Sequence, residues 1–530
     1  MRPAYPDSRD TCATFKANGK RFASLRTRLI RLILPSACYQ NPLMQGQTLN
    51  KGCLVATGAF GRTNSAIGWW SAWLAVLLLA SPPVFGQVSV FDPSFQIGPG
   101  ANDAVNALVV QQDGRILVGG DFTSIGGLSN SYFARLNADG AVDTSFVQGG
   151  ATDGSVNCLL QQPDRKVLVG GGFNRLLGVE RRGLARLLED GSVDADFNAG
   201  NVLATNESAF SFGLQDDGRI LIGLSEGDWV SRIVRVDTNG ALDATFYCTN
   251  QFPGYLFAIT PLDDGSILVG GNVYGVDGLP RYGLFRLQPD GRLDDTFNPG
   301  LEQYSSVFTM VKQASGHFLV GGLLNRTGAS NAVPLLRLTP DLQWDESFKT
   351  DRFVGGATPY GNSWITALLL QPDGEIVAGG SFFEVGGYWR RQIVRLTPDG
   401  HVDGCFDPGL GLGGAEPAGP VRRLALQADG RILVGGKFQG VDGHDQPLNL
   451  ARLLSESDCD RMRVYFLSGA WGSFDTFAAA TFPPGGTNSL EWSENLSDWQ
   501  TLETNTSPYI YYYFPMTSAP QAFFRARKEF

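Results

Sequence analysis

Aspartate recurs at one fixed place in this sequence, three residues before a phenylalanine, in a D-x-x-F segment. A carboxylate can bind a metal ion or act as a general acid or base. Such chemistry is needed at a single site, whereas this aspartate returns in every repeated unit. An aspartate at a strand edge also accepts backbone N–H bonds in the adjoining turn, and the phenylalanine can pack between units. We therefore predict a structural role for seven aspartates: Asp92, Asp143, Asp194, Asp243, Asp294, Asp345 and Asp403.

Other residues that commonly carry chemistry are sparse. The three histidines, His317, His401 and His444, are isolated and lack metal-ligand spacing. The sequence contains no G-x-S-x-G, no H-E-x-x-H and no catalytic-cysteine signature. Its repeated Gly-Gly pairs precede no expected helix, so they do not indicate a phosphate-binding loop. The sequence therefore predicts no catalytic residue, no metal site and no cofactor.

Arginine and aromatic residues occur together in several expected loops. Aromatic rings stack on sugar faces or anchor protein partners, and arginine binds carboxylates. These residues therefore form a candidate binding face for a protein or an acidic polysaccharide. The alternative is that they cover the edges of the units or form surface ion pairs. The candidates are Arg181, Arg182, Arg281, Tyr282, Tyr388, Trp389, Arg390 and Arg391.

The elements that position these residues are repeats. DGRILVGG occurs at 113–120 and at 429–436, and five variants lie between them at steps of 47 to 58 residues. A second motif, RLNADGAVDTSF at 135–146, follows the first copy and recurs behind the later ones. The Asp-Gly pairs predict two-residue type I′ hairpin turns, in which both central residues have positive φ. Each unit of about fifty residues thus reads as four short antiparallel strands.

The repeats are offset at the two ends of the array. The last copy lacks a D-x-x-F segment, while FDPSF at 91–95 precedes the first copy. We predict an all-β fold, a seven-bladed β-propeller of four-stranded blades that is closed by an N-terminal strand. A β-solenoid is the alternative, but its coils are usually shorter and it needs no such strand exchange.

The combined motif resembles the delta-60 repeat, a bacterial repeat of uncharacterised function. The resemblance covers about residues 91–454 and rests on the L-Q-x-D-G-R-I-L-V-G-G core and on R-L-x-x-D-G-x-x-D-x-(S/T)-F. It implies a propeller, and it carries over no catalytic residue.

Residues 1–86 read as an N-terminal extension and a secretory signal peptide. The apolar run IGWWSAWLAVLLLA at 67–80 is followed by two prolines and a small residue, Gly86, after which cleavage is expected. A membrane anchor is the alternative, although the run is shorter than a spanning helix requires. The propeller is expected over 87–458. The tail, 459–530, resembles the small C-terminal β-sandwich modules of secreted bacterial proteins, through EWSENLSDW at 491–499 and FFRAR at 523–527.

Composition narrows the function. The chain has 530 residues, 67 of them glycine, and this glycine content argues against a helical protein. The net charge of -10 and the pI near 5.0 argue against a nucleic-acid binder. The cysteines after Gly86 are too few for a disulfide scaffold, and their pairing stays open. We expect a secreted, cell-surface or periplasmic protein, with membrane contact only through an uncleaved signal. It would be a non-enzymatic binder of a protein or glycan through its variable loops. The alternative is a carbohydrate-active hydrolase or lyase on a propeller, which needs unrepeated carboxylates, histidine or tyrosine at the axial mouth.

Overall fold

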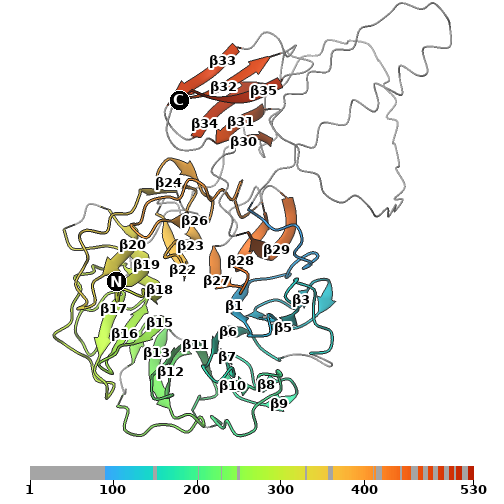
Figure 1. Cartoon of the computed structure of the whole chain (residues 1–530). Coiled ribbons are helices and arrows are strands. Elements are labelled where there is room, and N and C mark those ends of the chain that lie inside the picture. Colours follow the sequence, from blue (N-terminus) through green and yellow to red (C-terminus); the bar gives the residue numbers. More distant parts are fainter. Residues whose placement is uncertain are drawn as a thin grey trace, which may run out of the picture. The chain divides into compact units, whose positions relative to one another are not determined.

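The computed structural model shows an all-β chain (Figure 1). No part of the chain that it describes is helical, and none therefore forms a helix that could cross a bilayer. The extension and signal peptide expected at 1–86 lie outside the described residues. The structure describes residues 90–146, 152–200, 202–227, 229–247, 251–328, 331–355, 362–409, 411–413, 420–441 and 444–454, and the strands between 463 and 529.

The repeat region forms a series of small antiparallel sheets, each made from three main strands that follow one another along the chain. The first strands are β1 (Val105–Val110), β6 (Val156–Gln161), β11 (Glu207–Leu214), β15 (Leu256–Pro261), β18 (Ser306–Lys312), β22 (Trp364–Leu370) and β27 (Val421–Leu426). The second strands are β2 (Ile116–Gly120), β7 (Val167–Gly171), β12 (Ile220–Glu226), β16 (Ile267–Gly271), β19 (Phe318–Leu324), β23 (Ile376–Ser381) and β28 (Ile432–Val441). The third strands are β5 (Phe133–Leu136), β10 (Leu184–Leu187), β13 (Val230–Val236), β17 (Leu284–Leu287), β20 (Val333–Leu338), β26 (Ile393–Leu396) and β29 (His444–Leu453).

Short strands occur in the connections. One of them, β14, joins the sheet of β11, β12 and β13. The others pair among themselves in the loops after the second strands, except that β21 lies in the connection before β22 and pairs with β24. They are β3 (Ser124–Ile125), β4 (Leu128–Ser129), β8 (Arg175–Leu176), β9 (Val179–Glu180), β14 (Phe252–Pro253), β21 (Phe353–Val354), β24 (Glu384–Val385) and β25 (Tyr388–Trp389).

Each first strand contacts the first strand of the neighbouring sheets. The contacts run from β1 through β6, β11, β15, β18 and β22 to β27, and β27 also contacts β1 (Figure 1). The second strands are apolar runs such as ILVGG and are buried along most of their length, because a sheet packs on each of their faces. The buried clusters accordingly combine residues of two sheets, such as Ile116 of β2 with Leu433 of β28.

The Gly-Gly pairs allow this close approach. A Cβ added to Gly119 would lie 2.4 Å from a methyl group of Val156 in the next sheet, and one added to Gly120 would lie 2.1 Å from the Ala104 carbonyl oxygen. The same contact with the following sheet recurs at Gly435, where the neighbour is Val105 of the first sheet. Any larger residue at these positions would separate the strands.

The structure corrects the prediction of a fourth strand in each unit. The segment before each D-x-x-F forms one isolated bridge with the end of the third strand, as between Leu136 and Val142, and no ladder follows it. The reason is local, because the Asp143 side chain accepts the Ser145 N–H at 3.0 Å and its carbonyl accepts the Phe146 N–H at 3.2 Å. These bonds turn the chain at the position where a strand would continue.

The structure also corrects the predicted turn type, because the Asp-Gly turns are not of type I′. Gly114 has a φ of +84°, but Asp113 does not have a positive φ. The Gly114 N–H donates to the Gln111 carbonyl at 2.9 Å, and the Asp113 carboxylate accepts the Arg115 N–H at 2.9 Å. This is the three-residue hairpin in which a glycine in the left-handed region follows a type I turn.

The N-terminal segment bonds to the third strand of the last sheet with the contacts that D-x-x-F forms elsewhere. Phe91 bridges Leu453, and the Asp92 N–H donates to the Arg452 carbonyl at 2.8 Å. The Asp92 carboxylate accepts from Arg452 Nε at 2.8 Å, and both side chains are 4% exposed. The remaining six units pair an arginine and an aspartate eight residues apart, whereas here the partners are 360 residues apart.

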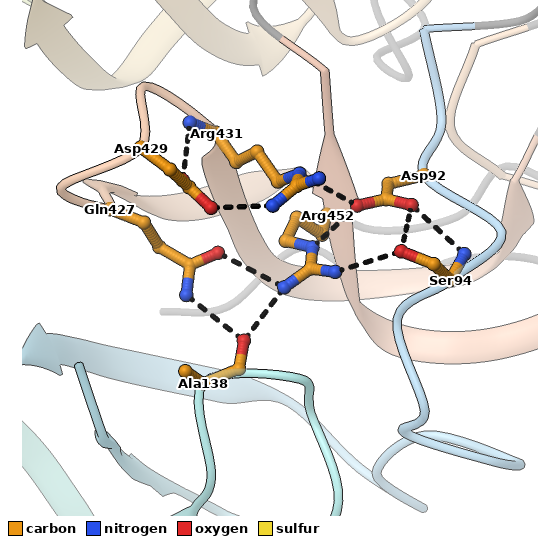
Figure 2. A network of polar contacts seen from close by, with 7 residues as sticks. All are labelled: Asp92, Ser94, Ala138, Gln427, Asp429, Arg431 and Arg452. Atoms are coloured by element: carbon orange, nitrogen blue, oxygen red, sulfur yellow. Dashed lines mark hydrogen bonds and ion pairs between the residues drawn. The ribbon is translucent and has the colours of Figure 1, made fainter.

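Figure 2 shows how this pair extends to the first sheet. The Arg452 guanidinium also donates to Ser94 Oγ at 3.2 Å and to the Ala138 carbonyl at 2.7 Å. Gln427 donates to the same carbonyl at 3.2 Å, and Arg431 approaches Asp92 at 3.1 Å. One network therefore connects the N-terminal segment, the last sheet and the turn after β5.

The tail contains two three-stranded antiparallel sheets, ordered β30-β31-β34 and β33-β32-β35, and contacts join the two sheets. Their strands are β30 (Arg463–Ser468), β31 (Asp475–Thr481), β32 (Thr487–Ser493), β33 (Gln500–Asn505), β34 (Tyr509–Pro515) and β35 (Phe523–Glu529).

Candidate functional site

A β-bulge in every first strand builds the candidate site. The pairing with the second strand shifts register at the same point in each unit, for example between Val105 and Ala107. A bulge re-aims the side chain of the extra residue. The bulged residues line one cavity of about 380 Å³, together with Asp121, Pro420 and Arg423. They are Asn106, Asn157, Phe210, Phe257, Phe308, Thr366 and Arg422.

One side of the cavity is aromatic. The rings of Phe257 and Phe308 lie 5.2 Å apart between centroids, and Tyr255 contacts both Phe257 and Phe210 at 6.2 and 5.6 Å. Trp229, which is 58% exposed, lies 5.2 Å from Tyr255. A continuous row of rings therefore runs from an exposed surface to the cavity wall.

The other side is polar and comes from the first, second and last sheets. Asn106 donates to the Asp121 carboxylate at 3.1 Å and accepts a hydrogen bond from Arg422. Arg422 also lies 3.6 Å from the Asp121 carboxylate. Arg423 donates to the Arg422 carbonyl at 2.8 Å, and Asn157 donates to the Ala209 carbonyl at 3.1 Å. These groups can donate to and accept from a ligand on the side opposite the rings.

A second cavity of about 200 Å³ shares residues with the first. Phe257, Phe308, Thr366, Arg422 and Arg423 line both. The additional residues of the second cavity are mainly apolar: Phe212, Ala258, Ile259, Thr260, Thr309, Met310, Ala367, Leu368 and Leu424. The second cavity therefore shares Thr366 and both arginines with the first and adds mainly apolar side chains.

The repeated aspartates lie away from both cavities and are engaged in their own turns. Arg135 Nε donates to Asp143 at 2.8 Å, and its guanidinium lies 4.2 Å from the Phe146 ring centroid. The same guanidinium donates to the Asp190 carbonyl in the next unit at 2.8 Å. The seven pairs are Arg452–Asp92, Arg135–Asp143, Arg186–Asp194, Arg235–Asp243, Arg286–Asp294, Arg337–Asp345 and Arg395–Asp403.

Hydrogen bonds and the neighbouring arginine of each turn stabilise the ionised aspartate. Burial alone would raise the pKa of Asp243, but the hydrogen bonds from Thr245 and the neighbouring Arg235 outweigh it and lower the pKa to about 2. For Asp345, the hydrogen bond from Ser347 is the main reason that the pKa falls to about 2. A carboxylate held in this state is a poor general acid at neutral pH.

The structure spreads the arginines and aromatics expected on the binding face over several units, and neither cavity includes them. Arg281 and Arg390 are only 6% and 1% exposed, which differs from the exposed position that the sequence predicts. Their guanidinium groups donate to the carbonyls of Asp295 at 2.9 Å and Gly404 at 3.4 Å, inside the D-x-x-F turns. The Arg390 guanidinium is therefore held against its own turn.

The other residues of that group are more accessible. Arg182 is exposed, and half-buried Arg181 donates to the Asp194 carbonyl at 3.5 Å. Half-buried Tyr282 packs against an apolar cluster. The remaining three, Tyr388, Trp389 and Arg391, make ring contacts. The Trp389 ring and the Arg391 guanidinium lie 6.1 and 5.9 Å from the centroid of the Phe383 ring. The Tyr388 ring lies beneath the Arg390 guanidinium.

The cavity residues were missed by sequence reasoning, although a signal exists. The bulged residue of the first strand changes from Asn to Phe, Thr and Arg along the units, while the residue before it is apolar in every unit. Among the residues that the structure describes, no three His, Cys, Asp or Glu side chains gather as metal ligands. Asp121 is the single carboxylate in the two linings. Of the described cysteines, Cys158 is a buried free thiol and Cys405 is disulfide-bonded.

Six segments of the chain match the family described as "Domain of unknown function (DUF5122) beta-propeller". These six segments are therefore repeats of that beta-propeller family, which confirms the resemblance drawn from the motifs. The matched residues are 111–146, 162–197, 215–246, 262–297, 371–406 and 427–460.

No curated protein matches the sequence. Among solved structures, a protein of unknown function from Bacteroides caccae is 14% identical and covers 55% of this chain and 92% of its own, with a TM-score of 0.32. The calcium-binding protein regucalcin from Agrobacterium tumefaciens is 12% identical over 69% of this chain and 92% of its own, with a TM-score of 0.30. A fungal alcohol oxidase of the AA5 family is 15% identical and covers 80% of this chain and 90% of its own, with a TM-score of 0.37.

Proposed function

We propose that the chain is a secreted, non-enzymatic binding protein built on a closed, seven-bladed β-propeller, with a β-sandwich-like tail. The contacts of β27 with β1 and the Asp92–Arg452 pair support closure, because they supply at the ends of the array the contacts that each unit makes internally. The missing seventh D-x-x-F is supplied by the N-terminal segment.

The observation that carries the binding function is the lining of the larger cavity. The seven residues at equivalent bulges are of four types, Asn, Phe, Thr and Arg, whereas the residue before each bulge is apolar in every unit. The bulges lie near the start of the first strands, and Asp121 directly follows β2. The cavity therefore faces the loops between sheets and the connections after the second strands, where a ligand can be reached.

The carbohydrate-active enzyme receives less support from this lining. Acid–base cleavage of a glycosidic bond uses two carboxyl groups in most such enzymes. The described cavity residues include one, Asp121, and it is held by Asn106 and Arg422. A binding protein needs no second titratable group.

A glycan array and a capture experiment with candidate protein partners test this function on the purified chain. We expect a ligand whose binding falls when Phe257 is replaced by alanine, and stays when exposed Arg182 is replaced by glutamine. A ligand that depends on Arg182 and not on Phe257 would move the site to the loops. Turnover of a glycan with loss of activity in Asp121→Asn would favour the enzyme instead.

Secretion is tested separately. We expect the mature protein to be recovered outside the cytoplasm with Gln87 as its first residue, because cleavage is expected after Gly86. A mature protein that retains residues 67–80 in a membrane fraction would favour the anchor.

A further inference from the structure

Arg423 departs from the pattern of the repeat in a way that the fold does not require. In every unit the residue directly after the bulge pairs with a glycine of the second strand. In six units it is small, and in the last unit alone it is an arginine. The small residues are Ala107, Cys158, Ser211, Ala258, Thr309 and Ala367.

The Arg423 side chain lines the cavity and has no carboxylate partner of its own among the described residues. Both cavities include this side chain, and its hydrogen bond goes to a main-chain carbonyl, that of Arg422. Over the described residues no aspartate or glutamate forms an ion pair with it, whereas Arg422 has Asp121 at 3.6 Å. The lining therefore carries two cations and one anion.

An uncompensated cation in a partly dry cavity is destabilising, and buried charges are otherwise paired. Burial lowers the pKa of Arg423, but a guanidinium stays protonated at neutral pH. A feature that costs stability and breaks the repeat pattern points to a ligand that supplies the missing negative charge. Arginine suits a carboxylate because its donors match the two oxygens.

The opposite wall restricts the ligand further. Phe257 and Phe308 offer flat apolar faces, while Asn106, Asn157 and Thr366 offer amide and hydroxyl groups between the rings and the arginines. A sugar ring has an apolar face and a rim of hydroxyl groups, so it can contact both walls at once. A volume of about 380 Å³ lies within the usual range of small-ligand sites.

We infer that the larger cavity binds a uronic acid residue of an acidic glycan, with the sugar face on the phenylalanines and the carboxylate at Arg423. This inference rests on the proposed binding function and names its ligand class.

The experiment is calorimetric titration of the purified chain with three probes: a trimer of galacturonate, a trimer of mannuronate and a hyaluronan tetrasaccharide. We expect at least one of them to bind, and its fully methyl-esterified form to bind about 10- to 100-fold more weakly, because the charge-assisted hydrogen bonds are lost. Arg423→Ala should weaken binding to a similar extent. Arg292→Gln changes an arginine whose side chain is 64% exposed and lies outside both cavities, so it should leave the affinity unchanged.

Arg423→Ala also separates a ligand-binding role from a structural one. The variant restores the small residue of the other units and removes an unpaired charge, so we expect its thermal midpoint to equal or exceed that of the wild type. A clear drop in the midpoint would identify Arg423 as a structural residue and overturn the inference.

The remaining outcomes are distinct. If no uronate probe binds, or if acid and ester bind equally, the ligand class is wrong. The proposed binding function still stands in that case if a neutral glycan or protein partner loses affinity in Phe257→Ala. If no ligand of any class responds to that variant, both proposals fail.

Discussion

Replacing Asp92 by asparagine tests whether the ion pair with Arg452 joins the two ends of the repeat region. Asp92 is buried and accepts from Ser94 N at 2.9 Å, from Ser94 Oγ at 2.6 Å and from Arg452 Nε at 2.8 Å. Asparagine fills the same space but leaves the buried Arg452 charge without its counterion, which costs about 3–5 kcal/mol in comparable sites. We expect Asp92→Asn to lower the free energy of unfolding by about that amount, measured by urea denaturation with tryptophan fluorescence.

The matched control is Asp429→Asn. Asp429 belongs to the same network and pairs with Arg431, but its side chain is 47% exposed, so its loss should cost only about 0–1 kcal/mol. Hydrogen exchange locates the effect, because the Leu454 amide donates to the Val90 carbonyl at 2.6 Å and should lose protection in Asp92→Asn. Equal costs for the two variants, or an unchanged Leu454 amide, would refute the reasoning.

Three further predictions concern packing, pH and thiol reactivity. Gly379→Ala would place a Cβ 2.4 Å from a Val421 methyl group, so it should lower the free energy of unfolding in urea by about 1–3 kcal/mol. At Gly227 an added Cβ meets no atom within 4 Å, so Gly227→Ala should leave that free energy unchanged. Because the pKa of Asp243 is lowered to about 2 in the folded state, its contribution to stability is complete above the unfolded pKa of about 3.9 and is lost as the pH falls toward 2. Unfolding free energies measured from pH 6 to 2.5 should therefore decline mainly below pH 4, and a flat profile would contradict the assignment. Burial raises the pKa of the Cys158 thiol, so alkylation with peptide mapping should label it only after denaturation.

The sequence predicts the repeated scaffold because each unit repeats its local chemistry. The apolar runs, the Gly-Gly pairs and the all-β character are present in the structure, and the family of the repeat is confirmed. The fourth strand was wrong because the sequence pattern of AVDTSF suits a strand, while the Asp143 side chain bonds to the N–H of Ser145 and bends the chain. The Asp-Gly turn type was wrong because a single positive φ, at Gly114, closes a three-residue loop.

The residues that line the cavity could not be predicted from the sequence. Residues such as Asn106, Phe257 and Arg422 converge only because a bulge shifts each first strand by one residue, and a bulge leaves no fixed residue type in the sequence. The arginines at 281 and 390 illustrate the reverse case. Their guanidinium groups bond to main-chain carbonyls of turns 14 residues ahead, a contact that depends on the folded turn and not on side-chain type.

The pairing of Asp92 with Arg452 also sets the timing of folding during synthesis. A ribosome that adds about 5–20 residues per second needs about 20 to 70 s to cover the 360 residues between the two partners. Throughout that interval Asp92 lacks its arginine, and the first sheet lacks the neighbour that β27 later provides. The nascent chain therefore keeps an open sheet edge, a known site of misassociation, until almost the last residue of the repeat region has been made. Chains that terminate before Arg452 should accumulate in this state, and chaperones that shield strand edges should affect the yield of this protein most during that window.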